Sequence, residues 1–238
     1  MADRPDPGRH RPGRTRSTRD LATALLTPEG GGGAELRGHL PPHPRGVVLV
    51  LHGGAVESRV PVTWWRLPVL RMAPFATAVQ RRADGALAVV RLKNRVRGWN
   101  GTRQDPVHDA RWALDRIRLV LPGLPVVLVG HSMGGRVALQ LSGEPDVVGI
   151  AALAPWIDSD TRQPPPRVAV LLAHGSSDRV TDPRRTDVLA KRYTDRGVDL
   201  RYVEVEGGTH SMLRAASRWH DLVADFVTDV LIGPDRSS

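Results

Sequence analysis

The chain has 238 residues, of which 40% are hydrophobic and 25% charged, and this composition is typical of one folded domain with a substantial buried core. It contains no cysteine, which excludes disulfides, thiolate catalysis and cysteine-ligated zinc. The longest apolar runs are only as long as a strand, so we expect no membrane-spanning segment and no membrane partner.

The net charge of +9 comes from arginine, because only two of the 34 basic residues are lysines. Six arginines and three aspartates lie within residues 1–20, and the other charges are spread along the chain. No stretch combines concentrated basic residues with an aromatic platform, as a nucleic-acid-binding surface would. We therefore expect a solvated, arginine-rich surface and no nucleic-acid partner.

Composition divides the chain into three segments. Residues 1–33 are predicted to be a disordered basic tail and a glycine-rich link, because they are rich in Arg, Pro and Gly and have no apolar periodicity. The folded domain is predicted at residues 34–232, with a flexible C-terminus at residues 233–238. The apolar run at residues 21–26 is too short for a signal peptide, so the expected location is the cytoplasm.

From residue 34 onward, strand and helix patterns alternate. A short edge strand is predicted at residues 34–40, and the continuous apolar run at 46–51 predicts a strand buried on both faces. Further strands are predicted at residues 86–92, 126–129, 147–152, 168–172 and 200–205. Helices are predicted at residues 66–82, 107–120, 136–141, 186–195 and 215–231. This alternation predicts a mostly parallel, doubly wound α/β sheet flanked by helices, with sites beyond the carboxyl ends of its strands.

The pentapeptide Gly-His-Ser-Met-Gly at residues 130–134 directly follows the predicted strand at residues 126–129. A G-x-S-x-G pattern at that place is typical of a sharp turn from a strand into a helix, which exposes the hydroxyl of its serine, here Ser132. A serine hydroxyl is a weak nucleophile by itself. It therefore needs a histidine as base and a carboxylate that orients this base.

Two later strands end at residues that could supply the base and the acid. The strand at residues 168–172 is followed by Asp178, and the strand at residues 200–205 is followed by His210. We expect His210 to take the proton of Ser132 and Asp178 to orient the imidazole, in the chain order Ser, Asp, His.

Two other aspartates are alternatives to Asp178 as the acid. Asp158 also follows a strand, and Asp182 stands where it could instead be the N-cap of the next helix. Asp178 is preferred because it directly follows a His-Gly segment that begins at His174. His52, His131 and His174 itself are expected to have structural roles.

The oxyanion of an acyl-transfer intermediate needs two preorganised N–H donors. The first is expected from the backbone of Met133, the residue after the serine. The second is expected from the loop after the strand at residues 46–51, where Gly54 is the first choice and Ala55 the alternative.

The segments around His52, Ser132, Asp178 and His210 together resemble the α/β-hydrolase family. The resemblance extends over residues 45–231 and is strongest to small single-domain members, the serine dienelactone-hydrolase-like and S33-peptidase-like enzymes. It implies a serine hydrolase that cleaves a small carboxylic ester through an acyl-enzyme. The alternatives are an acyltransferase or cofactor-free peroxidase on the same scaffold, and a non-catalytic binding protein that retains the fold.

Two departures from the family pattern bear on the entrance to the site. The oxyanion segment has two glycines rather than the HGGG of many lipases, which argues against the hormone-sensitive-lipase group. The connection at residues 154–168 is short where many relatives insert a helical lid. We therefore expect a minimal cap or none, and an open site.

The loops around Ser132 also contain candidates for substrate binding. Trp64, Trp65 and Trp156 are predicted either to line an apolar acyl pocket or to serve in loop packing. Arg95 and Arg97 follow the strand at residues 86–92, where they would recognise an acidic substrate or, as we prefer, form solvated surface. No set of histidines and carboxylates has metal-ligand spacing, so no metal and no cofactor are expected.

Overall fold

The computed structural model describes residue 25 and residues 33–233. The predicted tail and link, apart from residues 25 and 33, lie outside the described residues, as do residues 234–238 of the predicted C-terminus.

A single sheet of seven strands forms the centre of the described part of the chain, in the order β1-β3-β2-β4-β5-β6-β7. The strands are β1 (Glu35–His39), β2 (Gly46–Leu51), β3 (Leu87–Lys93), β4 (Val126–His131), β5 (Val147–Leu153), β6 (Ala169–Gly175) and β7 (Leu200–Val205). The edge strand β1 pairs antiparallel with β3, and all other neighbours pair in parallel. The predicted doubly wound, mostly parallel sheet is therefore confirmed.

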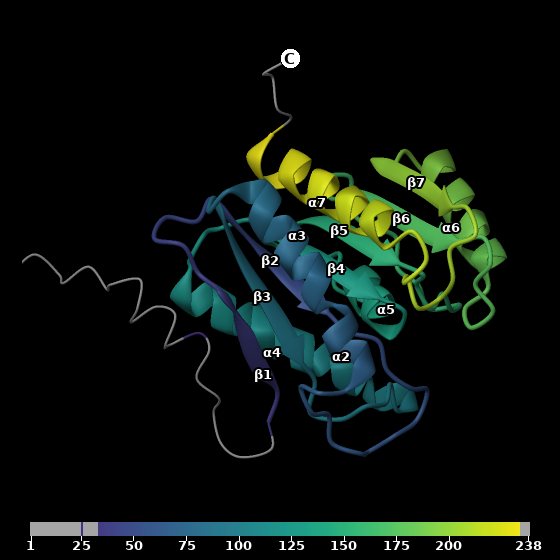
Figure 1. Cartoon of the computed structure of the whole chain (residues 1–238), viewed down its shortest axis with the longest axis horizontal. Helices are drawn as coiled ribbons and strands as arrows, with labels where there is room; N and C mark the ends of the chain where they lie inside the picture. Colours follow the sequence, from purple (N-terminus) through teal and green to yellow (C-terminus); the bar gives the residue numbers. More distant parts are fainter. Residues whose placement is uncertain (1–24, 26–32, 234–238) are drawn as a thin grey trace, which may run out of the picture.

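Helices cover both faces of this sheet (Figure 1). On one face lie α3 (Ala73–Ala83) and α7 (Ala216–Ile232), and on the other α4 (Asp105–Val120), α5 (Met133–Gln140) and α6 (Pro183–Asp195). Side chains of one strand alternate between the two cores: Val48 and Val50 of β2 pack with the first pair of helices, and Val47 and Leu49 with the other three. Because both faces are covered, the central strands are continuous apolar runs.

The predicted helix at residues 66–82 was wrong in one respect, because the structure divides it into α2 (Leu67–Arg71) and α3. The break falls at Met72, which caps the end of α2 and the start of α3. Pro68 and Pro74 each stand in the first turn of a helix, where a missing N–H costs no helical hydrogen bond. Each proline thus favours the start of a new helix rather than the continuation of an earlier one.

The connection between β5 and β6, at residues 154–168, contains no helix or strand. It is held against α5 by Arg136, whose guanidinium donates to Asp160 (2.8 Å) and lies over the ring of Trp156. The prediction of a fold without a cap is confirmed.

The loops that follow β2 and β3 are joined to each other beyond the carboxyl ends of these strands. Ala55 forms a parallel bridge with Gly98, and Pro61 forms an antiparallel bridge with Val96. These two loops, residues 52–62 and 94–100, are called the paired loops below.

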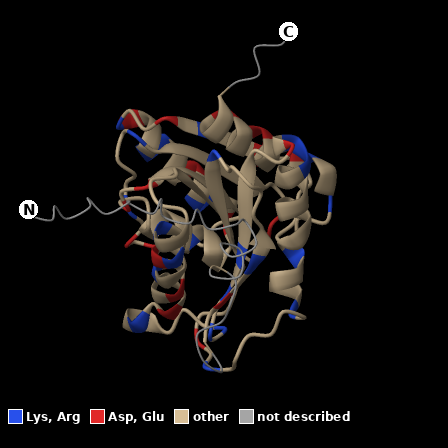
Figure 2. Cartoon of the chain, turned by 90° about the vertical axis from the view of Figure 1, so that its left-hand side faces the viewer, with Lys and Arg blue, Asp and Glu red and all other residues tan. Residues whose placement is uncertain are grey.

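Charges of both signs are interspersed over the face of the molecule that Figure 2 presents. Of the helices in the described part of the chain, none combines the length and the apolar character needed to cross a bilayer.

Candidate active site

The turn between β4 and α5 holds Ser132 in a strained backbone conformation, with φ 55° and ψ −116°. The chain around it is so close-packed that a Cβ on Gly130 would lie 2.1 Å from the carbonyl oxygen of Gly134. A Cβ on Gly134 would in turn lie 2.4 Å from the carbonyl oxygen of Leu51. The glycines of the pentapeptide are thus required for close backbone approach.

The structure brings together the three residues that the sequence singles out. His210, in the loop after β7, has its Nε2 atom 3.1 Å from the Ser132 hydroxyl and its Nδ1 atom 2.8 Å from Asp178 Oδ2. Because Nδ1 faces a carboxylate, it carries the proton, and Nε2 is left to accept from the serine hydroxyl. Strands β4, β6 and β7 are parallel members of one sheet, so their carboxyl ends deliver all three side chains to the same edge.

The Asp178 carboxylate is buried and fully hydrogen-bonded. Its Oδ1 atom accepts from the backbone N–H groups of Val180 (2.7 Å) and Thr181 (3.1 Å). Its Oδ2 atom accepts from His210 and also from His174 Nε2 (3.1 Å) and the Thr181 hydroxyl (2.8 Å). Burial alone would raise the pKa of this carboxyl, but the hydrogen bonds from His174, His210 and the backbone hold its pKa well below the usual range.

Sequence reasoning missed two of these contacts. His174 is buried in β6, where Nδ1 accepts from the Thr186 hydroxyl (2.7 Å) and Nε2 donates to Asp178, so its structural role is exerted on the acid itself. Thr181 contacts both the acid and the base, because its hydroxyl donates to Asp178 and also lies 3.1 Å from His210 Nδ1. The sequence signal that could have revealed the contact of His174 is its position four residues before Asp178.

The alternative acids lie elsewhere. Asp182 is the N-cap of α6, and its side chain accepts from the Arg184 N–H (3.0 Å). Asp158 forms an ion pair with Arg136 (3.3 Å) in the connection after β5. Of these carboxylates, only Asp178 contacts His210 in the described part of the chain.

The two alternatives for the second oxyanion donor differ in their hydrogen bonds. The Ala55 N–H donates to the carbonyl of Arg97 (3.0 Å), within the paired loops. Within the described part of the chain, the Gly54 N–H and the Met133 N–H each lack a backbone acceptor. A Cβ on Gly54 would lie 2.4 Å from the Met133 methyl carbon, so this glycine lies against the residue after the serine. This geometry favours Gly54 over Ala55.

Two buried histidines support this region. His52 donates from Nδ1 to the Gly53 carbonyl (2.7 Å) and accepts at Nε2 from the Asn94 N–H (3.2 Å), and burial lowers its pKa to about 4. His131 donates from Nε2 to the carbonyl of His210 (2.9 Å), and burial, followed by the neighbouring His210, lowers its pKa to about 3. Both rings are therefore neutral at pH 7, as expected of structural histidines.

These two histidines predict a loss of stability in acid. Unfolded, each would bind a proton near pH 6.5, whereas folded each does so only near pH 4 or below. The unfolded chain therefore takes up more protons as the pH falls from 6.5 towards 4, so the contribution is complete above pH 6.5 and is lost below it. Between pH 7 and pH 5 we expect the free energy of unfolding to fall by about 4 kcal/mol, about 2 kcal/mol per histidine.

Urea unfolding at pH 7, 6 and 5 measures this change. Replacing His52 with Gln should remove about half of the pH-dependent loss, whatever the variant's stability at pH 7. Replacing the exposed His43 with Gln should leave the loss unchanged. Equal stability of the unmodified chain at pH 7 and pH 5 would contradict the burial of two neutral histidines.

None of the three candidate tryptophans lines the cavity beside the serine turn. Trp64 is buried and donates from Nε1 to Glu35 (2.7 Å), whereas Trp65 is 78% exposed. Trp156 packs edge-on against Trp99, with 5.9 Å between ring centroids. These contacts favour loop packing for Trp64 and Trp156, and the pocket is formed by other residues.

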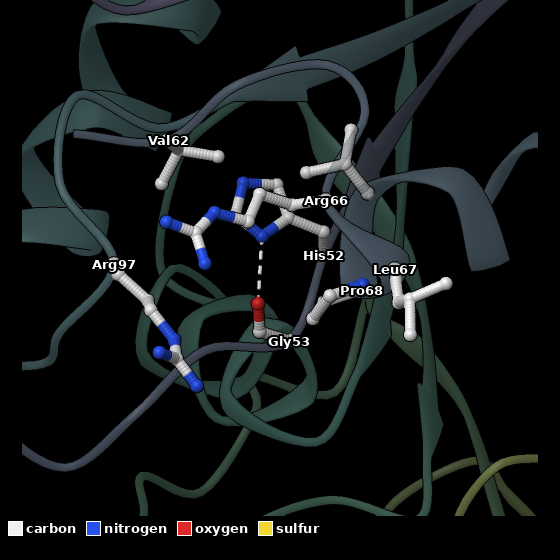
Figure 3. Close-up of a pocket in the computed structure, with 8 residues that line it drawn as sticks. His52, Gly53, Val62, Arg66, Leu67, Pro68 and Arg97 are labelled. Carbon is white, nitrogen blue, oxygen red and sulfur yellow. Dashed lines mark hydrogen bonds between the residues drawn. The ribbon is translucent and has the colours of Figure 1, made fainter. Parts of the chain in front are cut away.

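The cavity has a volume of about 220 Å³ and lies beside the first turn after β2 (Figure 3). It is lined by His52, Gly53, Val62, Arg66, Leu67, Pro68, Val69 and Arg97. In the described part of the chain, no group of three or more histidines and carboxylates is arranged to hold a metal ion.

Comparison with known proteins bears on the fold that carries these residues. The family model for serine aminopeptidase S33 matches residues 93–171. A protein of unknown function from Agrobacterium tumefaciens has a similar structure, with a TM-score of 0.67 at 19% identity over 86% of this chain and 94% of its own. An α/β serine hydrolase without a lid from Xanthomonas campestris has a TM-score of 0.61 at 19% identity, over 83% and 89%. The chain has the α/β-hydrolase fold.

A further structure with the α/β-hydrolase fold is Est1E from Butyrivibrio proteoclasticus, solved with bound ferulic acid. Its TM-score is 0.61 at 15% identity, over 84% of this chain and 96% of its own. No curated protein sequence matches the chain. The resemblance drawn from the sequence is thus confirmed at the level of the α/β-hydrolase fold, and the S33 match contains Ser132 but ends before Asp178 and His210.

Proposed function

We propose that this chain is a serine hydrolase that cleaves a small carboxylic ester through an acyl-enzyme on Ser132. The observation that carries the proposal is the continuous line of hydrogen bonds from the Ser132 hydroxyl through His210 to Asp178. A nucleophile, a base and an orienting acid within hydrogen-bond distance meet the requirements of covalent acyl transfer.

In the first half-reaction, His210 Nε2 removes the hydroxyl proton while Ser132 Oγ attacks the ester carbonyl. Asp178 holds the imidazole in the required tautomer and stabilises its protonated form. The N–H groups of Met133 and Gly54 donate to the oxyanion of the tetrahedral intermediate. The protonated His210 then gives its proton to the alcohol that leaves, and the acyl group stays on Ser132.

In the second half-reaction, water replaces the alcohol. His210 takes a proton from the water as it attacks the acyl carbonyl, and returns the proton to Ser132 as the acid is released. None of these steps requires a cofactor or a metal, and we propose that the reaction takes place in the cytoplasm.

An ester is favoured as the substrate because Est1E, which shares the fold, was solved with a carboxylic acid bound. The uncapped connection at residues 154–168 leaves the serine turn without a helical cover, which suits small esters that reach the site directly from solvent.

Labelling with a fluorophosphonate tests the nucleophile, because this reagent phosphonylates an activated serine. We expect one label per chain, on the peptide that contains Ser132, and loss of labelling when His210 is replaced with Gln. The control is Ser211→Ala, which removes a neighbouring hydroxyl that is bonded to Thr209 (3.1 Å) and should leave labelling intact.

Absence of label on Ser132 would instead support a non-catalytic binding protein. Product analysis by mass spectrometry, with and without an added alcohol acceptor, then separates hydrolysis from acyl transfer. A free carboxylic acid as the main product in the presence of the acceptor supports the hydrolase.

A further inference from the structure

The cavity beside the serine turn adjoins the proposed nucleophile. Gly53 is part of its lining, and a Cβ on Gly53 would lie 3.4 Å from the Cβ of Ser132. Arg97, another lining residue, accepts through its backbone carbonyl from the Ala55 N–H (3.0 Å). Ser132 and Gly54 are not themselves part of the lining, and the cavity adjoins the serine turn through Gly53, which directly precedes Gly54 in the chain.

Two guanidinium groups border the cavity without an acidic partner. Figure 3 shows Arg66 and Arg97 as lining side chains beside Gly53. Both are exposed, and neither forms an ion pair with any carboxylate in the described part of the chain. No acidic side chain is part of the lining.

Two other arginines between β3 and α4 do have acidic partners. Arg95 pairs with Asp109 and Asp105, and Arg103 pairs with Asp105 at 3.0 Å. Arg95 is thus paired with Asp109, whereas Arg97 is part of the cavity lining, and the choice between substrate recognition and solvated surface stays a prediction for both. Arg97 therefore differs from Arg95 and Arg103 in having no carboxylate partner in the described part of the chain.

A third arginine, Arg71, is not part of the lining but lies near the serine turn. Arg71 forms no ion pair with a described residue, and it lies close enough to His131 for its charge to contribute, after burial and His210, to the lowered pKa of that ring. Beside His52 and Gly53, the other walls of the cavity are apolar and are formed by Val62, Leu67, Pro68 and Val69. Charges beside an apolar wall are less screened than charges in bulk water, so the cavity attracts anions more strongly than open surface does.

We propose that the substrate is an ester that also carries an anionic oxygen group, a carboxylate or a phosphate, and that Arg66 and Arg97 bind this group. The apolar wall would contact the short carbon chain between the anion and the ester carbonyl at Ser132. A guanidinium is well suited to this role, because its parallel N–H groups pair with both oxygens of a carboxylate or phosphate. The inference rests on the proposed serine hydrolase function and names the substrate class of the same site.

A matched pair of esters tests the proposal. Mono-p-nitrophenyl adipate and p-nitrophenyl hexanoate have acyl chains of equal length and differ in the terminal carboxylate. We expect the ratio of kcat/KM for adipate to that for hexanoate to fall by about tenfold in each of Arg66→Gln and Arg97→Gln, the loss of one charged hydrogen bond. Added salt should lower kcat/KM for the adipate ester far more than for the hexanoate ester.

The control variant is Arg201→Gln. Arg201 is exposed at the amino end of β7, whereas the serine turn lies at the carboxyl end of β4. Its replacement should therefore leave the ratio unchanged. Inhibition of hexanoate turnover by inorganic phosphate or by adipate identifies the anion, the stronger inhibitor naming the group that the site prefers. Inhibition should weaken in Arg97→Gln.

The outcomes separate the two proposals. If Ser132→Ala abolishes turnover of both esters while Arg66→Gln and Arg97→Gln leave their ratio unchanged, the anionic substrate class is overturned and the hydrolase stands. If Ser132→Ala leaves both activities in place, the proposed function itself fails. Thermal unfolding of each variant confirms that a changed ratio reflects binding and not misfolding.

Discussion

Replacing Ser132 with Ala is expected to lower kcat for p-nitrophenyl acetate by about 10⁴-fold or more, because the acyl-enzyme can no longer form. The residual rate would come from binding and from the oxyanion donors. Alanine also has a Cβ, so the strained backbone with φ 55° is occupied by a side chain of nearly the same size in both forms. The free energy of unfolding should therefore change by no more than about 0.5 kcal/mol.

Steady-state kinetics and urea unfolding of the same Ser132→Ala preparation check both parts. A tenth of the original activity in the folded variant would contradict the assignment of the nucleophile. Ser142→Ala is a useful control, because Ser142 is buried at the far end of α5 and no role in acyl transfer is proposed for it.

Replacing Asp178 with Asn is expected to lower kcat by about 10⁴-fold at pH 7. The amide would present an N–H to His210 Nδ1 and so favour the tautomer in which Nε2 carries the proton and cannot accept from Ser132. The charge that stabilises the protonated imidazole would also be lost. Because Asp178 accepts from Val180 and Thr181 as well, we expect the free energy of unfolding to fall by about 1–3 kcal/mol.

The two alternative acids provide matched controls for Asp178→Asn. Asp182→Asn keeps a good N-cap, so both kcat and stability should be nearly unchanged. Asp158→Asn removes one partner of the buried Arg136, which keeps its ion pair with Asp160, and should leave kcat within about twofold because Asp158 does not contact His210. A larger loss of kcat in either control than in Asp178→Asn would overturn the choice of acid.

The sequence was sufficient to predict the strands of the sheet and most of the helices that flank it. The apolar run at Gly46–Leu51 predicts β2, because a strand buried in a parallel sheet leaves a plain compositional pattern. The strand predicted at residues 200–205 has the bounds of β7, although this edge strand also contains Arg201 and Glu204. The division of the helix at residues 66–82 was not predicted. Pro68 and Pro74 are compatible with a helix start as well as with a kink in one long helix, so the sequence alone leaves the break at Met72 open.

The three central residues of the site were also open to prediction, since each follows a strand and the topology of a parallel sheet brings such positions together. The contacts of His174 and Thr181 were not, because hydrogen bonds to Asp178 Oδ2 depend on the path of one short loop. The pocket was the least predictable part. Trp64 is a large aromatic residue of the kind that often lines a pocket, yet its indole N–H donates to Glu35 of the edge strand β1.

The paired loops have a consequence for how this site can change. One loop carries Gly54 and the other Arg97, and they are joined by the Ala55–Arg97 hydrogen bond and by the bridges at Ala55–Gly98 and Pro61–Val96. An insertion or deletion in either loop would shift the register of both and so displace the oxyanion donor together with the arginine. New substrate preferences should therefore arise in these loops by exchange of side chains at fixed loop length, for example at Arg97, whose side chain can change without moving the oxyanion donor.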